Sequence, residues 1–220
     1  MQTRYRTDYE GEFVLVKSHW YDSEKTQDRE WVENIVNNQH ISSRAVVIGS
    51  DVDDWQFDFR RLARHRGGIL GTRRLQSYGS GDIWKQMKFD FVVSTVDTEI
   101  QEMLDAGYHV DNVVFTNTSN VIKNPGNFYV VPYQPRMDQL ATAVYMAAFD
   151  GHEEVFLVGY NKDTPHGIIS WEDHVNEVFE SYPNTSFFVI GVQPNMPNAW
   201  FNNTNVSCMS YHDFVMYCDI

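Results

Sequence analysis

Residues 138–163 constrain the fold of this chain more than any other part of the sequence. Apolar residues recur every three or four positions from Met137 to Ala148, and this spacing predicts a helix packed on a core. Gly151 follows the last apolar turn, where a residue without Cβ most easily adopts the left-handed conformation that ends a helix. Residues 155–158 are then apolar without alternation, as in a parallel strand covered on both faces. The stretch therefore predicts a helix, a tight turn and the central strand of an α/β sheet.

Strands and helices are predicted to alternate along the rest of the chain. Further strands are expected at 12–17, 45–49, 69–70, 89–94, 112–116, 128–131 and 186–192. Further helices are expected at 30–38, 55–66, 98–106 and 170–182, with a helical turn or two at 80–87. This alternation is typical of βαβ units. It predicts an α/β fold in which a single Rossmann-like domain spans residues 1–220, with a mainly parallel sheet and helices on both faces. Residues 1–40 are expected to add an N-terminal strand and helix, and residues 194–220 an irregular C-terminal tail.

The acidic balance of the chain bears on its partners. The formal net charge is −13 over 220 residues, and such a surface repels phosphates, which disfavours broad nucleic-acid binding. No apolar run approaches the roughly 20 residues that cross a bilayer, and the first residues lack the apolar segment of a signal peptide. We therefore expect a cytoplasmic protein that has no membrane partner.

Positive charge is nevertheless concentrated in one segment. Six arginines occupy fifteen positions: Arg60, Arg61, Arg64, Arg66, Arg73 and Arg74. An arginine cluster can bind a phosphate-bearing ligand, and Arg64 and Arg66 are expected to contact it. DNA is a second ligand that the cluster permits and the net charge disfavours. The plainer interpretation is a solvated helix face whose arginines pair with neighbouring acids.

Polar residues follow most of the predicted strands. Because the carboxyl ends of parallel strands meet at one edge of a sheet, these residues are expected to line a shared ligand site. Their hydroxyl and amide groups suit hydrogen bonds to a sugar, a ribose or a base edge. The sequence has no GxGxxG, GxxxxGK[ST] or GxSxG motif, which argues against nicotinamide enzymes, P-loop ATPases and α/β-hydrolases. The expected contacts are Gly49, Ser50, Thr95, Asn117, Thr118, Gly159, Tyr160 and Asn161.

Asp51 and Asp53 form a D-x-D pair directly after the predicted strand 45–49. Carboxylate oxygens are hard ligands that suit Mg²⁺ or Mn²⁺, and such a pair can hold a metal that bridges a diphosphate. Asp51 is also a candidate acid or base for catalysis. The alternative is that one of the two carboxylates caps the helix expected to begin near Trp55.

His166 lies in the polar segment that follows the central strand. A histidine in this place could act as a general base on an acceptor hydroxyl. The alternative is a solvent-exposed loop histidine with no catalytic part. Cys208, His212 and Cys218 do not have the spacing of a zinc site, and no zinc is expected there.

The sequence YMAAFDGHEEVFLVGYNKD, at 145–163, resembles a stretch shared by bacterial family-42 sialyltransferases and MptE-like Rossmann proteins. In those proteins an alanine-rich helix, a glycine turn and a strand end border the nucleotide site. Asn161 stands where that group has aspartate, and residues 49–53 depart from its G-N-G-P-S-like first loop. The resemblance implies sugar transfer from a nucleotide donor, with His166 as the base by its position. The matching residues are Gly151, Val155, Phe156, Leu157, Gly159 and Tyr160.

Two hypotheses for function follow. The first is a glycosyltransferase whose nucleotide-sugar donor lies across the strand ends, where a divalent metal (Mg²⁺ or Mn²⁺) or the arginines of residues 60–74 neutralise the diphosphate. Asp51 or His166 would deprotonate the acceptor, which is a glycan hydroxyl or a hydroxymethylated base of phage DNA flipped out of the duplex. The second is a non-catalytic Rossmann-like protein whose acidic surface binds a protein partner.

Overall fold

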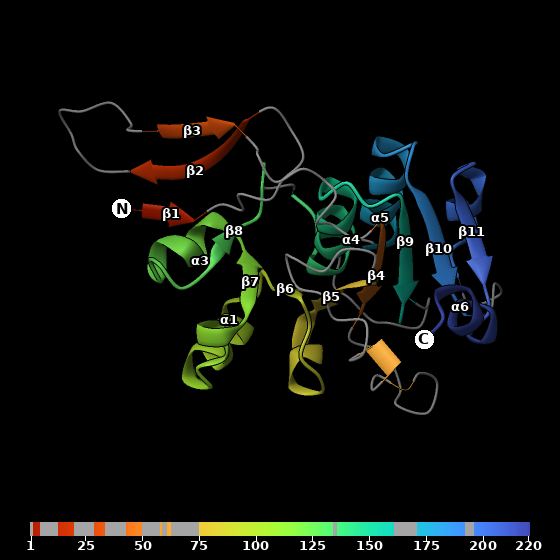
Figure 1. Cartoon of the computed structure of the whole chain (residues 1–220), viewed down its shortest axis with the longest axis horizontal. Coiled ribbons are helices and arrows are strands. Elements are labelled where there is room, and N and C mark those ends of the chain that lie inside the picture. The colour runs from red at the N-terminus through yellow and green to blue at the C-terminus, as the bar shows by residue number, and fades with distance from the viewer. Residues whose placement is uncertain are drawn as a thin grey trace.

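A computed structural model describes residues 2–4, 13–19, 29–33, 43–49, 58, 61–62, 75–133, 136–160, 171–191 and 196–220. Its strands form one open sheet in the order β11-β10-β9-β4-β5-β6-β7-β8-β1-β2-β3 (Figure 1). Within the described residues, the eight strands from β11 to β8 run parallel to one another, which confirms the predicted α/β, Rossmann-like fold. These strands are β4 (Arg44–Ile48), β5 (Gln76–Ser80), β6 (Phe91–Val93), β7 (Val113–Thr116), β8 (Tyr129–Val130), β9 (Glu154–Val158), β10 (Ser186–Ile190) and β11 (Val206–Met209).

Three N-terminal strands extend the sheet beyond β8. β1 (Gln2–Arg4) runs parallel to β8, with which it pairs at Arg4 and Tyr129. β2 (Phe13–His19) is antiparallel to β1, and β3 (Arg29–Glu33) is antiparallel to β2. The N-terminal strands therefore lie at the end of the sheet opposite to β11 (Figure 1).

Helices cover both faces of the parallel sheet. In Figure 1, α4 and α5 lie above the sheet, and α1 and α6 lie below it. The described helices are α1 (Asp97–Asp105), α2 (Tyr108–Asp111), α3 (Thr118–Lys123), α4 (Gln139–Phe149), α5 (Trp171–Ser181) and α6 (Tyr211–Cys218), with 3-10 turns η4 (Gly81–Lys85) and η6 (Asn198–Asn202). None of the helices in the described ranges is long and apolar enough to span a membrane.

Successive residues of the central strands enter two different cores. Val47 and Leu157 pack in the core under α4 and α5, whereas Val46 and Phe156 pack in the core on the α1 and α6 face. All four side chains are fully buried. A strand with helices on both faces needs apolar residues at every position, which explains why β4 and β9 show no alternation in the sequence.

Helix α4 connects the two halves of the sheet. Asp138 caps its first turn, because Asp138 Oδ1 accepts hydrogen bonds from the backbone N–H groups of Leu140 (2.7 Å) and Ala141 (3.1 Å). Every residue from 140 to 148 is buried, and the helix packs on the central strands β4, β5, β6 and β9 and on α5. Gly151 follows it with φ of +86°, as the sequence predicted.

The strand order reverses between β4 and β9. Strands β4 to β8 succeed one another on one side of this point, and β9 to β11 on the other side. In open α/β sheets, ligands bind at such a reversal, beyond the carboxyl ends of the strands. A glycine follows each of the two strands here: Gly49 after β4 and Gly159 after β9.

The two glycines bring the strand ends into close contact. The backbone N–H of Gly49 donates to the carbonyl of Val158 at 2.9 Å. A Cβ at Gly49 would lie 2.9 Å from the Gly159 carbonyl oxygen and 3.1 Å from Leu140 Cδ2. No side chain fits at Gly49 unless α4 or β9 shifts.

A buried polar cluster lies under α4, near the start of β9. The Tyr78 hydroxyl is 2.5 Å from Asp150 Oδ2, to which it donates, and 2.9 Å from His152 Nε2. All three residues are at most 1% exposed. The cluster ties β5 to the turn between α4 and β9, because the tyrosine comes from the strand and the other two residues from the turn.

The structure corrects three expectations from the sequence. Residues 30–33 of the predicted helix 30–38 belong to strand β3. The C-terminal residues predicted to be irregular contain η6, β11 and α6. Strand β5 at Gln76–Ser80 was not predicted, because its sequence QSYGS is polar although all five residues are buried. The predicted strand 69–70 and most of the predicted helix 55–66 lie outside the described residues.

We expect Gly49→Ala to lower the free energy of unfolding by about 1–3 kcal/mol, because the added methyl overpacks the contact with Gly159 and Leu140. Gly107→Asn is the matched control. Gly107 has a φ of +66°, which asparagine tolerates, and no atom lies within 4 Å of the point that a Cβ would occupy there. Urea unfolding of both variants should show a loss that is specific to position 49, and equal losses would contradict the close approach.

Tyr78→Phe should lower the free energy of unfolding by about 1.5–3 kcal/mol, the usual range for a buried hydrogen bond to a charged group. Tyr145→Phe serves as the comparison, since its hydroxyl donates to a neutral carbonyl, that of Pro132, at 3.2 Å. A cost of about 0.5–1.5 kcal/mol is expected there. Chemical denaturation that ranks the two variants in the reverse order would show that the Tyr78 cluster does not stabilise the fold.

Candidate functional site

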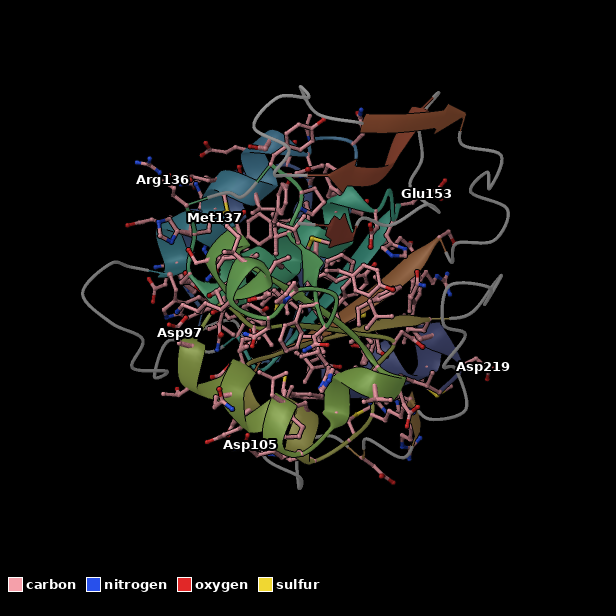
Figure 2. The ribbon with its side chains drawn as sticks, turned by 90° about the vertical axis from the view of Figure 1, so that its left-hand side faces the viewer. Asp97, Asp105, Arg136, Met137, Glu153 and Asp219 are labelled. Carbon is pink, nitrogen blue, oxygen red and sulfur yellow. The ribbon has the colours of Figure 1, made fainter. Side chains whose placement is uncertain are left out.

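The candidate site is the carboxyl edge of the sheet around β4 and β9. Five residues lie side by side along this edge, in the spatial order of their strands. They are Gly159 (after β9), Gly49 (after β4), Ser80 (the last residue of β5), Ser94 (after β6) and Asn117 (after β7). In Figure 2, Asp97, Arg136 and Met137 mark the side of the molecule where α1 and α4 begin, and Glu153 and Asp219 lie on the opposite side. Helices α1 and α4 both begin at the carboxyl edge because each follows a parallel strand.

Ser80 lies beside Gly49 at this edge. Ile48 pairs with Gly79, so that the residues which follow them, Gly49 and Ser80, are neighbours on adjacent strands. The Ser80 side chain is on the same face of β5 as Tyr78, toward α4, because strand side chains alternate. Ser80 is fully buried, and its Oγ makes no hydrogen bond within the described part of the chain. A buried hydroxyl without a partner is costly, and such an atom calls for an explanation, such as a bound water, an ion or a catalytic role.

Thr95 and Asn117 are both held by protein groups. The Asn117 Nδ2 donates to the Thr95 carbonyl at 3.0 Å, and its Oδ1 accepts from the backbone N–H of Asn120 at 2.9 Å, which caps α3. The Thr95 N–H donates to Gln139 Oε1 at 3.3 Å. The predicted ligand contacts Thr95 and Asn117 therefore brace the loops after β6 and β7. Thr118, in the first turn of α3, keeps an Oγ1 that is buried and has no partner among the described residues.

Glu99 ties α1 to the start of α4. Its Oε2 accepts a hydrogen bond from Ser94 Oγ at 2.6 Å, and its Oε1 accepts one from Gln139 Nε2 at 3.2 Å. Gln139 is thus bonded through both ends of its amide, to Glu99 and to Thr95. This network fixes the loop after β6 against the N-terminus of α4.

Tyr160 follows Gly159 at the carboxyl end of β9. It is 1% exposed, and its hydroxyl donates to the Leu140 carbonyl at 3.0 Å. Burial, and secondarily the negative charge of Asp138, raise the pKa of Tyr160 well above its ordinary value. The hydroxyl therefore stays protonated and acts as a donor to α4. Its ring packs edge-on against Trp171, the first residue of α5.

His174 and Asp138 form a pair at the same edge. His174 Nδ1 lies 3.2 Å from Asp138 Oδ2 and also 3.2 Å from the backbone nitrogen of Asp138. Their side chains are 15% and 26% exposed, so the pair is sheltered but within reach of solvent. If Nδ1 carries the proton, it donates to the carboxylate and Nε2 is a proton acceptor. If Nδ1 is unprotonated, it accepts from the Asp138 N–H and Nε2 is a donor.

A continuous set of contacts joins this pair to the strand reversal. Leu140 touches the Gly49 position through its side chain, accepts from Tyr160 through its carbonyl and donates to Asp138 through its N–H. Asp138 then contacts His174. The His174–Asp138 pair is therefore held beside the ends of β4 and β9. A histidine positioned by a carboxylate can take or give a proton in acid–base chemistry.

Several predicted site residues fall outside the described part of the chain. They are Ser50, Asp51, Asp53, Arg64, Arg66, Asn161 and His166. The predicted metal pair Asp51 and Asp53 is among them, and the residues that are described contain no group of three or more histidine, cysteine, aspartate or glutamate side chains that could hold a metal. Of the arginine segment, Arg61 is described, and its Nη1 donates to the carbonyl of Ile220 at 3.0 Å.

His174 and Ser80 were not predicted from the sequence. His174 belongs to no motif, and its partner Asp138 is 36 positions away, so the pair is brought together by the packing of α5 on α4. Ser80 lies in the strand that the sequence did not predict. The sequence offers one weak sign that His174 lies at the site: it stands in the first turn of a helix that follows a buried strand.

Comparison with known proteins gives a likeness of fold. No family model matches the chain, and no curated protein matches it. Among solved structures, the chain matches the sialyltransferase CstII from Campylobacter jejuni, whose structure was analysed in complex with a substrate analogue, cytidine-5'-monophosphate. The TM-score is 0.43 and the identity 9%, over 75% of this chain and 84% of that chain. At this TM-score and identity the match is a distant likeness of fold, and nothing about the neighbour's activity is carried over to this chain.

Alanine substitutions at Ser80 and Ser94 test whether each hydroxyl supports the fold. Ser80→Ala should leave the free energy of unfolding unchanged or raise it by up to about 1 kcal/mol, because it removes a buried hydroxyl that has no partner among the described residues. Ser94→Ala, which is equally buried but bonded to Glu99, should cost about 1.5–3 kcal/mol. Thermal denaturation compares the two, and an equal loss in Ser80→Ala would mean that the Ser80 hydroxyl supports the fold.

Proposed function

We propose that this protein is a glycosyltransferase that binds a nucleotide sugar at the carboxyl ends of β4 and β9 and transfers the sugar to an acceptor hydroxyl. One observation carries the proposal: the His174–Asp138 pair lies in a continuous set of contacts with the glycine-ended strands at the reversal of strand order. A binding crevice for a nucleotide and a positioned proton acceptor are the two parts that such a transfer needs.

The donor would lie against Gly49 and Gly159. Glycine lets a ligand approach the backbone closely, and the reversal of strand order opens the crevice there. The hydroxyls of Ser80 and Thr118, which have no partner among the described residues, would hydrogen-bond to the polar edges of a ribose, a sugar or a base. Ser50 and Asn161, which follow the two glycines in the sequence, are proposed to add contacts from the loops.

The diphosphate would need charge compensation. We assign this to Arg64 and Arg66 and to a Mg²⁺ or Mn²⁺ held by Asp51 and Asp53, on the sequence argument that arginine and metal-bound carboxylates neutralise phosphates. When bound, such a metal would stabilise the charge that builds up on the leaving nucleotide.

His174 is the proposed general base. With the proton on Nδ1 held by Asp138, Nε2 would take the proton of the acceptor hydroxyl. The acceptor oxygen forms its bond to the anomeric carbon of the sugar. The bond from that carbon to the phosphate oxygen breaks at the same time, and its electron pair leaves with the nucleotide. His166, the base expected from the sequence, is the alternative for this role.

A small or glycan acceptor fits this protein better than DNA. The net charge is −13, and an acidic surface repels a nucleic acid over its whole length. The base of a DNA acceptor would also have to be flipped into the site. The arginines of residues 60–74 remain the segment through which a DNA acceptor would bind.

Nucleotide binding is the first test. In a thermal-shift panel of UDP-, CMP- and GDP-sugars, each with and without Mn²⁺, at least one donor should stabilise the protein, by about 2.7 kcal/mol at 100 times its dissociation constant. Ser80→Ala should reduce that stabilisation without unfolding the chain. If no nucleotide sugar shifts the transition, the protein is not a glycosyltransferase of this kind, and the non-catalytic binding protein is favoured.

Catalysis is tested at the histidine. His174→Gln should lower the rate of sugar transfer about 10²–10⁴-fold and leave donor binding in place, because it removes the base and not the crevice. Asp138→Asn should also slow transfer while an amide oxygen still caps α4. His212→Gln, an exposed histidine on α6, is the control. If His174→Gln transfers the sugar at the wild-type rate, His174 is not the general base.

A further inference from the structure

Glu99 is a half-buried carboxylate at the carboxyl edge, and no cation bonds to it in the described chain. Its two donors, Ser94 Oγ at 2.6 Å and Gln139 Nε2 at 3.2 Å, are both neutral. A carboxylate that is partly removed from water and has no cation partner is costly. A glutamine at position 99 could make both hydrogen bonds without that cost, so bracing the two neighbours does not explain the charge.

The contacts of Glu99 place its carboxylate beside the proposed site. They join α1, on one face of the sheet, to the first residue of α4, on the other face (Figure 1). The residues on either side of Gln139 belong to the site: Asp138 holds His174, and Leu140 packs against the end of β4. Glu99 is therefore connected through Gln139 both to the proposed base and to the strand ends.

The carboxylate of Glu99 can still accept hydrogen bonds. A carboxylate has roughly four lone-pair sites and can only accept, and Ser94 and Gln139 occupy two of these sites. The remaining partners must therefore be donors. A diphosphate does not qualify, because it offers acceptor oxygens and carries the same sign of charge. Hydroxyls on neighbouring carbons of a sugar ring present two donors side by side.

The charges at this edge disfavour an acidic sugar. Asp138 is a second half-buried carboxylate, with its side chain 26% exposed, and His174 is uncharged when it serves as the base. Lys123 is bonded to a carboxylate of α1, and Arg136 is exposed to water, where its charge is screened. A carboxylate on the sugar would be a third negative charge beside Glu99 and Asp138, which like-charge repulsion opposes.

We propose that Glu99 binds the transferred sugar of the donor by accepting hydrogen bonds from two of its hydroxyls, and that this sugar is neutral. The inference rests on the proposed function and adds to it the class of sugar and a residue that recognises it. Ser94 and Gln139 act as positioning residues that hold the carboxylate over the end of β6. Uronates and sialic acids are the sugars that the site excludes.

Pairs of donors that differ by one carboxylate test the charge of the sugar. Isothermal titration calorimetry of the full chain would compare UDP-glucose with UDP-glucuronate, GDP-mannose with GDP-mannuronate, and CMP-N-acetylneuraminate with CMP. In the pair whose nucleotide binds, the neutral donor should bind about tenfold tighter than the acidic one. The proposal is overturned if the acidic member binds as tightly, or if CMP-N-acetylneuraminate binds more tightly than every neutral donor. The wild type is used throughout, so this comparison does not depend on how any variant folds.

Glu99→Gln tests the residue itself, because it removes the charge and keeps the groups that bond to Ser94 and Gln139. Binding of the neutral nucleotide sugar should weaken about tenfold, as expected when hydrogen bonds to a charged group are lost. Binding of the same nucleotide without its sugar should stay unchanged, which a merely structural role would not predict. Glu102→Gln, an exposed position on α1 whose carboxylate bonds to Lys85, is the control.

The outcomes separate this inference from the proposed function. If Glu99→Gln binds the nucleotide sugar within about twofold of the wild type, Glu99 does not contact the sugar. Equal losses for the nucleotide and the nucleotide sugar would assign Glu99 to the fold or to the base. Both results overturn the inference and leave the glycosyltransferase in place, because the wild type still binds its donor. If the wild type binds no donor, the proposed function fails and the inference fails with it.

Discussion

The contact between the ends of β4 and β9 is the constraint on which the rest of the site depends. The N–H of Gly49 reaches the Val158 carbonyl, and the Gly49 Cα lies so close to the Gly159 carbonyl that a Cβ would stand 2.9 Å from that oxygen. Leu140 fills the space beside Gly49, which fixes the first turn of α4 against the strand ends. Asp138, the cap of that turn, is thereby held beside His174 of α5. The two glycines thus determine where Asp138, at the start of α4, meets His174 of α5.

The two edges of the sheet near these strands differ in how their polar groups are used. At the amino end of β4, Arg44 Nε bonds to Glu154 Oε2 at 2.6 Å, Tyr217 bonds to the other oxygen at 2.6 Å, and the guanidinium lies 4.6 Å from the centre of the Tyr217 ring. Burial beside this cluster raises the pKa of Cys218 to about 12, which keeps its thiol protonated. At the carboxyl end, by contrast, the hydroxyls of Ser80 and Thr118 have no partner in the described chain. Paired groups stabilise the fold at the amino end, whereas the two hydroxyls at the carboxyl end are the groups that the proposed donor site would use.

Part of this arrangement could be predicted from the sequence. Helix α4 was predictable because a helix packed on a core has apolar residues at helical spacing. Strand β9 was predictable because a strand covered on both faces is apolar at every position. Strand β5 could not, because its polar residues are buried through tertiary contacts: Ser77 is bonded to Asp90 thirteen positions away. The segment 30–38 has apolar residues at helical spacing, yet residues 29–33 pair with β2, the strand before them in the chain, and a window of nine residues contains no sign of that pairing. The glycines of the site were predicted as ligand contacts, whereas the His174–Asp138 pair exists only once α5 packs on α4.

The central claim is that a nucleotide sugar binds where the strand order reverses. A crystal structure of the protein soaked with the donor that gives the largest thermal shift tests this most directly. We predict nucleotide density against the backbone of Gly49 and Gly159, with His174 facing the anomeric carbon of the sugar. Nucleotide bound elsewhere, such as at the amino edge beside Trp84 and Tyr108, with the ends of β4 and β9 free of ligand, would contradict it.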